Sequence, residues 1–126
     1  MPAINFQPRF ADLVASGAKT QTIRKSNRFK VGDTVQLYTG QRTKQCRKLG
    51  EGVVTEVAWI RLWRNRIGYF QVECWSAGLQ TNPDITDFAI ADGFIGAQEM
   101  ADWFRDTHGL PFGGWLIKWR LIDAPE

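Results

Sequence analysis

The chain has 126 residues, of which 44% are apolar, and this length supports one hydrophobic core rather than two, so we expect a single domain over residues 1–126. The sequence contains neither an uninterrupted run of about 18 apolar residues nor a charged leader followed by an apolar stretch. A membrane-spanning protein and a secreted precursor are therefore not expected.

The formal net charge of +3 conceals two parts of opposite charge. Residues 19–66 contain twelve Lys and Arg against three acids, whereas residues 67–126 contain three Lys and Arg against nine acids. A basic region of this density is typical of a surface that binds phosphate or another polyanion, and single-stranded RNA is one such partner. The alternative is a solvated basic face without a ligand.

One helix is predicted near the start of the chain, over residues 8–15. Pro8 suits the first helical turn, and apolar residues recur at helical spacing, namely Phe10, Leu13 and Val14. Gly17 fits the left-handed conformation that often ends a helix. Lys19 is therefore expected where this helix passes into a strand.

Most of the middle of the chain is predicted as strands. Alternating apolar residues and turn signals place them at residues 33–39, 52–62 and 68–75. Two further segments are predicted as irregular: a basic loop or hairpin tip at residues 41–50, and a loop with turn residues at 78–86.

The last part of the chain is predicted as a helix followed by a strand. Residues 97–108 carry apolar side chains at helical spacing, and residues 115–122 alternate as a strand whose one face holds Trp115, Ile117, Trp119 and Leu121. Trp103, Trp115 and Trp119 are expected in the core.

The fold class predicted from these elements is α+β, mainly β. Several short strands with helices only near the ends indicate a small β-barrel, closed or nearly closed, with two flanking helices. Cys46 and Cys74 lack the spacing of metal ligands, and we expect both as buried thiols of a cytoplasmic protein.

The segment Lys19-Thr20-Gln21-Thr22-Ile23-Arg24 concentrates an amine, three hydrogen-bonding side chains and a guanidinium. A lysine acts as a general base when burial or a nearby cation lowers its pKa. In an ideal strand Lys19 and Thr22 would face opposite sides, so they share a cleft only if Lys19 lies in the preceding turn. The alternative is that Lys19 and Arg24 bind phosphate or pair with acids.

Metal and cofactor chemistry are not expected from the residue pattern. His108 is the only histidine, and near a helix end it more often complements the helix dipole than takes part in catalysis. The sequence has no glycine-rich phosphate loop of the Walker or Rossmann type.

A second candidate binding element is the strand segment around Trp59, Arg61 and Trp63, which project to one face. Aromatic rings beside a guanidinium can stack nucleobases, worth roughly 1–3 kcal/mol per base. An intramolecular cation–π contact explains the same pattern equally well.

Two groups of residues in the expected order resemble the ASCH domain family of the PUA-like superfamily. The first is Phe10 and Leu13, Gly17-x-Lys19-Thr20-x-Thr22-Ile23-Arg24 and Val31-Gly32-Asp33; the second is Asp92-Gly93-Phe94, Glu99-Met100, Trp103-Phe104 and Phe112 to Trp119. The resemblance covers nearly the whole chain. It implies a PUA-like barrel whose cleft accepts nucleotides or RNA.

Within that family the chain is similar to small bacterial amidohydrolases that deacylate N4-acetylcytidine. The resemblance implies that Lys19 is a proton acceptor, Thr22 a nucleophile or water-orienting hydroxyl, and Asp92 the site carboxylate, with Glu99 as the alternative acid. It implies a modified nucleoside as substrate and no cofactor, and the candidate substrate-binding residues are Thr20, Arg24, Trp59, Arg61 and Trp63. A non-catalytic RNA-binding module and a ribonuclease that uses the same cleft are the alternatives.

Overall fold

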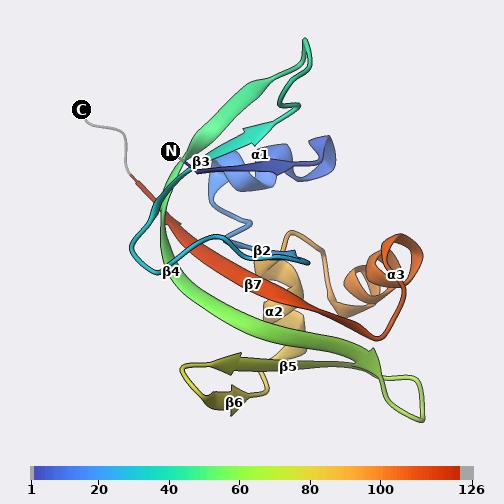
Figure 1. Ribbon diagram of the computed structural model, residues 1–126. Coiled ribbons are helices and arrows are strands. Elements are labelled where there is room, and N and C mark those ends of the chain that lie inside the picture. Colours follow the sequence, from blue (N-terminus) through green and yellow to red (C-terminus); the bar gives the residue numbers. More distant parts are fainter. Residues whose placement is uncertain (1, 123–126) are drawn as a thin grey trace.

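The computed structural model describes residues 2–122 as one strongly bent sheet with three helices on its inner side (Figure 1). In chain order the elements are β1 (Ala3–Phe6), α1 (Pro8–Ser16), β2 (Gln21–Arg24), β3 (Thr34–Thr39), β4 (Arg47–Arg64), β5 (Phe70–Ser76), β6 (Leu79–Thr81), α2 (Ile85–Ala91), α3 (Ala97–Thr107) and β7 (Phe112–Leu121). The predicted class, α+β and mainly β, is confirmed.

Strand β4 organises the sheet, because it pairs with three other strands. Strand β3 pairs with its first half and β5 with its second half, while β7 pairs with residues 52–62 on its other edge. Strand β2 continues the sheet beyond β7, β6 pairs with β5, and β1 lies parallel to β3. The resulting order β2-β7-β4-β3-β1 ends in two strands, β1 and β2, which do not pair with each other within residues 2–122.

The bend of the sheet has local causes in β4 and its neighbours. The register shifts between Leu37 and Tyr38 of β3 and between Val54 and Glu56 of β4, and such bulges increase strand bending and twist. Gly52 lets the strands approach closely at the bend, since a Cβ there would lie 3.0 Å from Cδ1 of Trp119.

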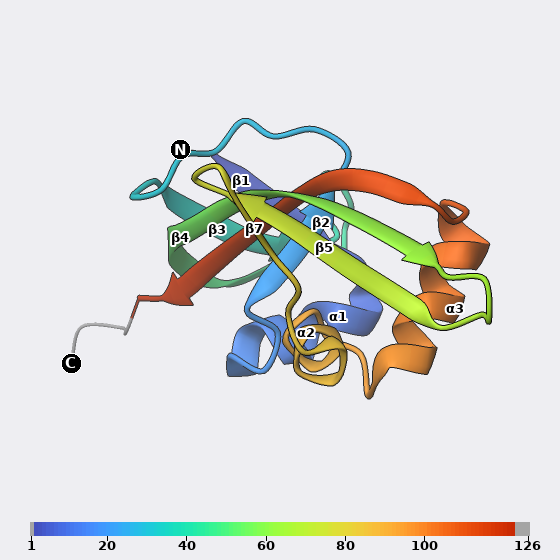
Figure 2. The same cartoon turned by 90° about the horizontal axis from the view of Figure 1, so that it is seen from below.

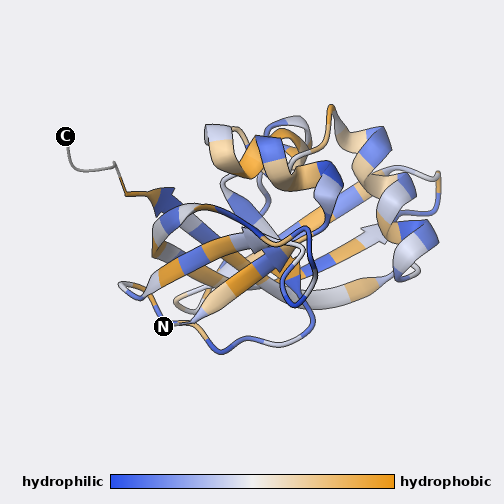
Figure 3. Cartoon of the chain, turned by 90° about the horizontal axis from the view of Figure 1, so that it is seen from above, coloured by the Kyte–Doolittle hydropathy of each residue, from blue (hydrophilic) through white to orange (hydrophobic). Residues whose placement is uncertain are grey.

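The three helices cover the concave face of the sheet (Figure 2). Apolar residues alternate with polar ones along the strands (Figure 3), so that Ile60 and Leu62 of β4 are fully buried beneath the helices while Trp59 is 40% exposed. Helix α3 contributes Met100 and Phe104 to this core, and burial of such side chains stabilises the fold by about 1.5–3 kcal/mol each.

Helix α1 follows the sequence rules that predicted it. Pro8 occupies its first turn, and Gly17 adopts φ 85° while its N–H donates to the Val14 carbonyl. The chain then turns, and β2 begins only at Gln21, so Lys19 lies before the strand as the shared cleft requires.

The prediction of two helices is wrong, because α2 is a third. The segment predicted as a loop at residues 78–86 contains β6 and the start of this helix. Asp84, within the segment predicted as a loop, is the N-cap of α2, and its Oδ1 accepts from the Asp87 N–H at 3.0 Å. A seven-residue helix that buries only Phe88 and Ala89 is too short to show helical periodicity in the sequence.

Strand pairing does not close the sheet between β1 and β2 in the part of the chain described, so a bent, open sheet is what is observed of the predicted barrel, closed or nearly closed. Two further expectations need correction. Cys46 is exposed in the tip between β3 and β4, while Cys74 is buried as expected. Trp119 is in the core, but Trp103 is half-buried at its margin and Trp115 is half-buried against Trp59. No helix within residues 2–122 is long and apolar enough to cross a membrane.

Candidate active site

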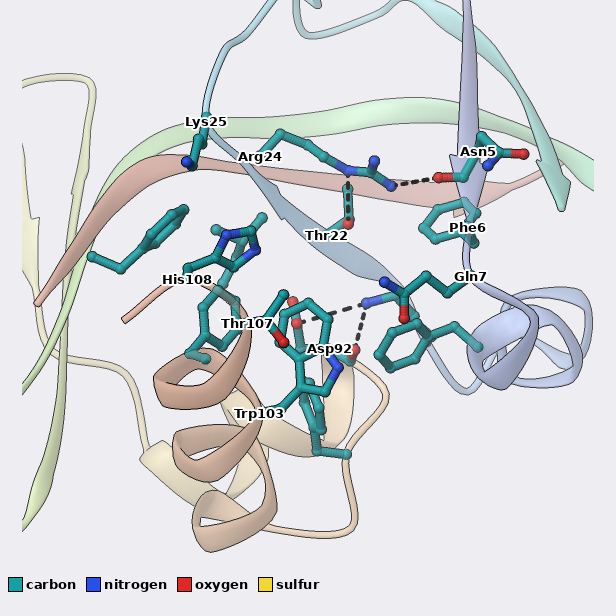
Figure 4. Close-up of a pocket in the computed structure, with 16 residues that line it drawn as sticks. Asn5, Phe6, Gln7, Thr22, Arg24, Lys25, Asp92, Trp103, Thr107 and His108 are labelled. Carbon is teal, nitrogen blue, oxygen red and sulfur yellow. Dashed lines mark hydrogen bonds and ion pairs between the residues drawn. The ribbon is translucent and has the colours of Figure 1, made fainter. Parts of the chain in front are cut away.

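A cavity of about 250 Å³ lies on the concave side of the sheet (Figure 4). Its wall combines polar and aromatic side chains from β1, α1, β2, α3 and the turn after α2. The lining residues are Asn5, Phe6, Gln7, Phe10, Lys19, Thr22, Ile23, Arg24, Lys25, Asp92, Phe94, Trp103, Phe104, Thr107, His108 and Phe112.

Lys19 is the most deeply buried cation of the cavity, at 2% exposure. Its backbone N–H donates to the Leu13 carbonyl at 2.9 Å, which fixes the turn after α1. Its Nζ donates to the backbone carbonyl of Asp92 and lies 3.7 Å from Oδ2 of the same residue. The ring centroid of Phe10 is 4.8 Å from this Nζ, so the amine is held between an acid and an aromatic face.

Asp92 is positioned by the end of α2, where it is the C-cap, and it is 3% exposed. Gln21 at the start of β2 donates from Nε2 to Oδ1 of Asp92 at 3.2 Å. The next residue, Gly93, has φ 98°, and a Cβ there would lie 2.9 Å from Phe10 and 3.0 Å from the Lys19 side chain. Glycine at this position therefore permits Asp92 and Lys19 to meet.

Burial shifts the pKa values of this pair in opposite directions. Desolvation lowers the pKa of Lys19, and the Arg24 cation lowers it further, while Asp92 opposes both effects. Desolvation likewise raises the pKa of Asp92 against the attraction of Lys19 and the hydrogen bond from Gln21. Desolvation thus opposes the charged form of each group, while the attraction between Lys19 and Asp92 favours the charged forms.

Thr22 lies in β2 at 5% exposure, and its Oγ1 accepts from Nε of Arg24 at 3.3 Å. Because Arg24 supplies the donor, the Thr22 hydroxyl hydrogen is available to an acceptor. Arg24 also donates from Nη2 to the Asn5 carbonyl at 2.9 Å and lies over the Phe6 ring at 5.4 Å, as Figure 4 shows. Burial lowers the pKa of this guanidinium from its very high ordinary value.

Aromatic residues of α3 and β7 form the other wall of the cavity. Trp103 is half-buried there, with its ring centroid 6.1 Å from that of Phe10. His108 follows at the end of α3, where its ring contacts those of Trp103 and Phe112 at 5.6 and 5.0 Å. Partial desolvation, with a smaller effect of Lys25, lowers the pKa of His108 and so favours its neutral form.

Four of the predicted site residues lie together at the cavity: Lys19, Thr22, Arg24 and Asp92. Thr20 does not line it; that residue is exposed, and its backbone joins Ala91 and Trp119 by hydrogen bonds. Glu99 also lies outside the cavity, where it pairs with Arg9 at 3.2 Å and accepts from the Ile95 N–H.

The row Trp59-Arg61-Trp63 lies on the convex face of β4, away from the cavity. Arg61 stacks on the Trp63 ring at 4.5 Å and pairs with Glu73 at 3.6 Å, which is the intramolecular alternative considered for this pattern. Trp59 contacts Trp115 of β7 edge to face, with centroids 5.5 Å apart.

Sequence reasoning missed three residues of this site. Gln21 lies within the predicted segment, but its bond to Asp92 joins positions 71 residues apart and leaves no local signal. Asn5 and Trp103 line the cavity although the first was not singled out and the second was assigned to the core. One signal in the sequence could have placed Trp103 at the cavity: it lies next to the buried helical positions Met100 and Phe104, where a side chain can sit at the edge of the core.

No group of three or more His, Cys, Asp or Glu within residues 2–122 could hold a metal ion. Comparisons with protein-family models, with curated proteins and with solved structures found no match to this chain.

Proposed function

We propose that this protein is an amidohydrolase of the ASCH family that removes the acyl group from N4-acylated cytidines, with Lys19, Thr22 and Asp92 as catalytic residues. The observation that carries the proposal is the convergence of these three side chains on one cavity, with Lys19 only 2% exposed. Because burial lowers the pKa of Lys19, a neutral amine forms at lower pH than in a free lysine, and a general base must be neutral.

In the proposed mechanism, the neutral Lys19 amine takes a proton from the Thr22 hydroxyl, or from a water molecule that this hydroxyl orients. The oxygen then attacks the acyl carbonyl carbon, and Arg24 stabilises the negative charge that develops on the carbonyl oxygen. When the bond from the carbonyl carbon to N4 breaks, the Lys19 ammonium returns its proton to N4, and cytidine leaves. If Thr22 is the nucleophile, water hydrolyses the resulting ester, so both routes give cytidine and a carboxylate.

Asp92 has a positioning and electrostatic part in this proposal. Its backbone carbonyl and its carboxylate both hold the Lys19 amine, and Gln21 fixes the carboxylate from the other side. When Lys19 becomes an ammonium during the reaction, the adjacent Asp92 stabilises the new charge.

The size of the cavity supports a small substrate. Its volume of about 250 Å³ is below the roughly 300–1,000 Å³ of sites for drug-sized ligands, and it suits a pyrimidine with a small acyl group. The half-buried ring of Trp103 offers a face on which the pyrimidine can stack. The ribose would then lie at the mouth, near β1.

The family assignment brings with it a PUA-like barrel as the finer description of the fold. The strand order β2-β7-β4-β3-β1 supports this, because Arg24 of β2 reaches the Asn5 carbonyl of β1 and so bridges the two end strands by a side chain. A non-catalytic RNA-binding module is the second candidate function, and the excess of cations in residues 19–66 favours it.

The test is hydrolysis of N4-acetylcytidine, followed by ultraviolet absorbance, for the parent protein and the variants Lys19→Met and Thr22→Val. Lys118→Met and Thr81→Val serve as matched controls, because Lys118 pairs with Glu56 on the surface and Thr81 is exposed on β6. We expect each site variant to lose at least about 100-fold in kcat and both controls to retain the parental rate.

Absence of turnover by the parent would overturn the proposal, and salt-sensitive binding of single-stranded RNA in its place would favour the binding module. Full activity of folded Lys19→Met would exclude Lys19 as the base. A cytidine burst with an acyl adduct on Thr22, seen by mass spectrometry, would identify Thr22 as the nucleophile rather than as the residue that orients water.

A further inference from the structure

Three arginines lie at the gap between β1 and β2, and two of them donate hydrogen bonds to β1. Strand β3 donates hydrogen bonds to the carbonyls of Pro2 and Phe6, and carbonyls alternate along a strand, so those of Ala3 and Asn5 point to the free edge of the sheet. Arg24 donates to the Asn5 carbonyl at 2.9 Å, and Arg28 donates to the Ala3 carbonyl at 2.8 Å. We call this edge the β1–β2 seam.

The third arginine, Arg42, reaches the seam through the tip between β3 and β4. The N–H of its neighbour Gln41 donates to Oδ1 of Asn5 at 2.9 Å, which holds the tip against β1. Arg28, Gln41 and Arg42 line a groove of about 530 Å³ with Pro2, Ala3 and Asn5. Asn5 also lines the cavity, so this residue is common to the groove and the cavity.

The arginines of the seam differ from most other cations of the protein in lacking an acidic partner. Ion pairs within residues 2–122 involve Arg9, Lys19, Arg47, Lys48, Arg61, Arg64, Arg105 and Lys118. Arg24, Arg28 and Arg42 form none in the described part of the chain. Each guanidinium has five N–H donors, and a single carbonyl bond at Arg28 leaves most of them directed to solvent.

We propose that this groove binds a phosphate group attached to the ribose of the substrate, so that the substrate is a cytidine nucleotide rather than a free nucleoside. The inference rests on the proposed function for the base and acyl group, which fill the cavity. The ribose would then lie at Asn5, which lines both the cavity and the groove, and its phosphate would reach Arg28 and Arg42 in the groove. Arginine suits this task because its planar donors match phosphate oxygens in pairs.

Binding of reaction products tests the groove without requiring catalysis. Isothermal titration of the parent protein with cytidine and with cytidine 5′-monophosphate compares the two ligands directly. We expect the monophosphate to bind at least about tenfold more tightly, and we expect this advantage to fall with added salt. Arg28→Gln and Arg42→Gln should each remove most of the advantage and leave cytidine binding unchanged, while Arg66→Gln, in the exposed turn between β4 and β5, should change neither.

Equal affinity for the two ligands in the parent, or an advantage that survives in Arg28→Gln/Arg42→Gln, overturns the inference even if N4-acetylcytidine is hydrolysed. If the double variant binds cytidine 5′-monophosphate no more tightly than cytidine, the phosphate site is supported. This holds even if no acylated ligand is hydrolysed, because that result would contradict only the proposed function. A trinucleotide with a central cytidine distinguishes the two sources of phosphate: tighter binding than the monophosphate indicates an RNA chain, and weaker binding indicates a mononucleotide.

Discussion

The cavity and the convex face of β4 contain the same kinds of side chain in two different environments. In the cavity, Lys19 lies between Asp92 and the Phe10 ring at 2% exposure. On the convex face, Arg61 lies between Glu73 and the Trp63 ring, and half of its side chain is exposed. A cation, an acid and an aromatic ring are present in both regions.

Burial separates the two regions chemically. Water screens the pair of Arg61 and Glu73, and pairs of this kind contribute at most about 1 kcal/mol. Water is excluded from Lys19 and Asp92, and this desolvation lowers the pKa of Lys19 and raises that of Asp92. The comparison indicates that the depth at which a motif is held, more than its residue composition, decides whether it can transfer a proton.

The largest expected difference between the regions is in stability. Asp92→Leu should lower the free energy of unfolding by about 3 kcal/mol, because it leaves Lys19 buried without its acid, and adding Lys19→Met should restore most of this loss. On the convex face, Glu73→Leu and Arg61→Met should each change the free energy of unfolding by less than about 1 kcal/mol. Urea unfolding of the single and double variants gives the coupling energy of each pair. Equal coupling energies for the two pairs would show that burial does not distinguish them.

A second expected effect concerns the close approach at Gly93. Gly93→Ala should destabilise the protein by about 2 kcal/mol or more, since the new methyl group meets Phe10 and Lys19 in addition to the strain of positive φ. Gly68→Ala is the matched control, because Gly68 has φ 90° but open space around its Cβ position. Gly68→Ala should cost about 1 kcal/mol of stability, the cost of backbone strain alone. If thermal unfolding shows equal losses of stability for Gly93→Ala and Gly68→Ala, the close approach at Gly93 is unimportant.

The third effect is a shift in the pH dependence of turnover. If neutral Lys19 is the base, kcat should rise with pH, and the midpoint of the rise should lie below the ordinary lysine pKa of 10.5. Arg24→Gln removes a cation that lowers this pKa, so the rise should move to higher pH, whereas Asp92→Asn removes the main opposing influence and should move it to lower pH.

Arg24→Lys keeps the cation and serves as the control for the position of this rise. Rate profiles recorded over neutral to alkaline pH are the measurement. Shifts of the same sign in Arg24→Gln and Asp92→Asn would show that Lys19 is not the titrating group.

The smallest effect is expected on the convex face. Trp63→Leu should cost about 0.5–1 kcal/mol, as the loss of a partly exposed cation–π contact with Arg61. Turnover of N4-acetylcytidine should not change in this variant or in Trp59→Leu. A rise in KM in either one would show that the substrate extends to this face.

The sequence predicted those parts of the site that depend on neighbouring residues. Gly17 ends α1, so the turn that carries Lys19 toward Thr22 and Arg24 could be read from a few adjacent positions. Strands β3, β4, β5 and β7 were also predicted from local alternation, although β4 begins earlier than expected, at Arg47.

The parts that were not predicted depend on contacts between distant segments. The bond from Gln21 to Asp92 and the placement of Trp103 at the cavity arise only when α2 and α3 pack on the sheet. The open seam has the same origin, because whether a sheet closes depends on strand lengths and tilt as well as on the sequence of each strand.

The arginines of the β1–β2 seam have a consequence for the behaviour of the protein in solution. A free strand edge offers unpaired carbonyls to any extended chain, and this is a common route to aggregation. Arg24 and Arg28 cover the Asn5 and Ala3 carbonyls with charged groups, which repel a second copy of the same edge. The arginines that line the open edge thus also protect the sheet from growing by addition of another molecule's strand.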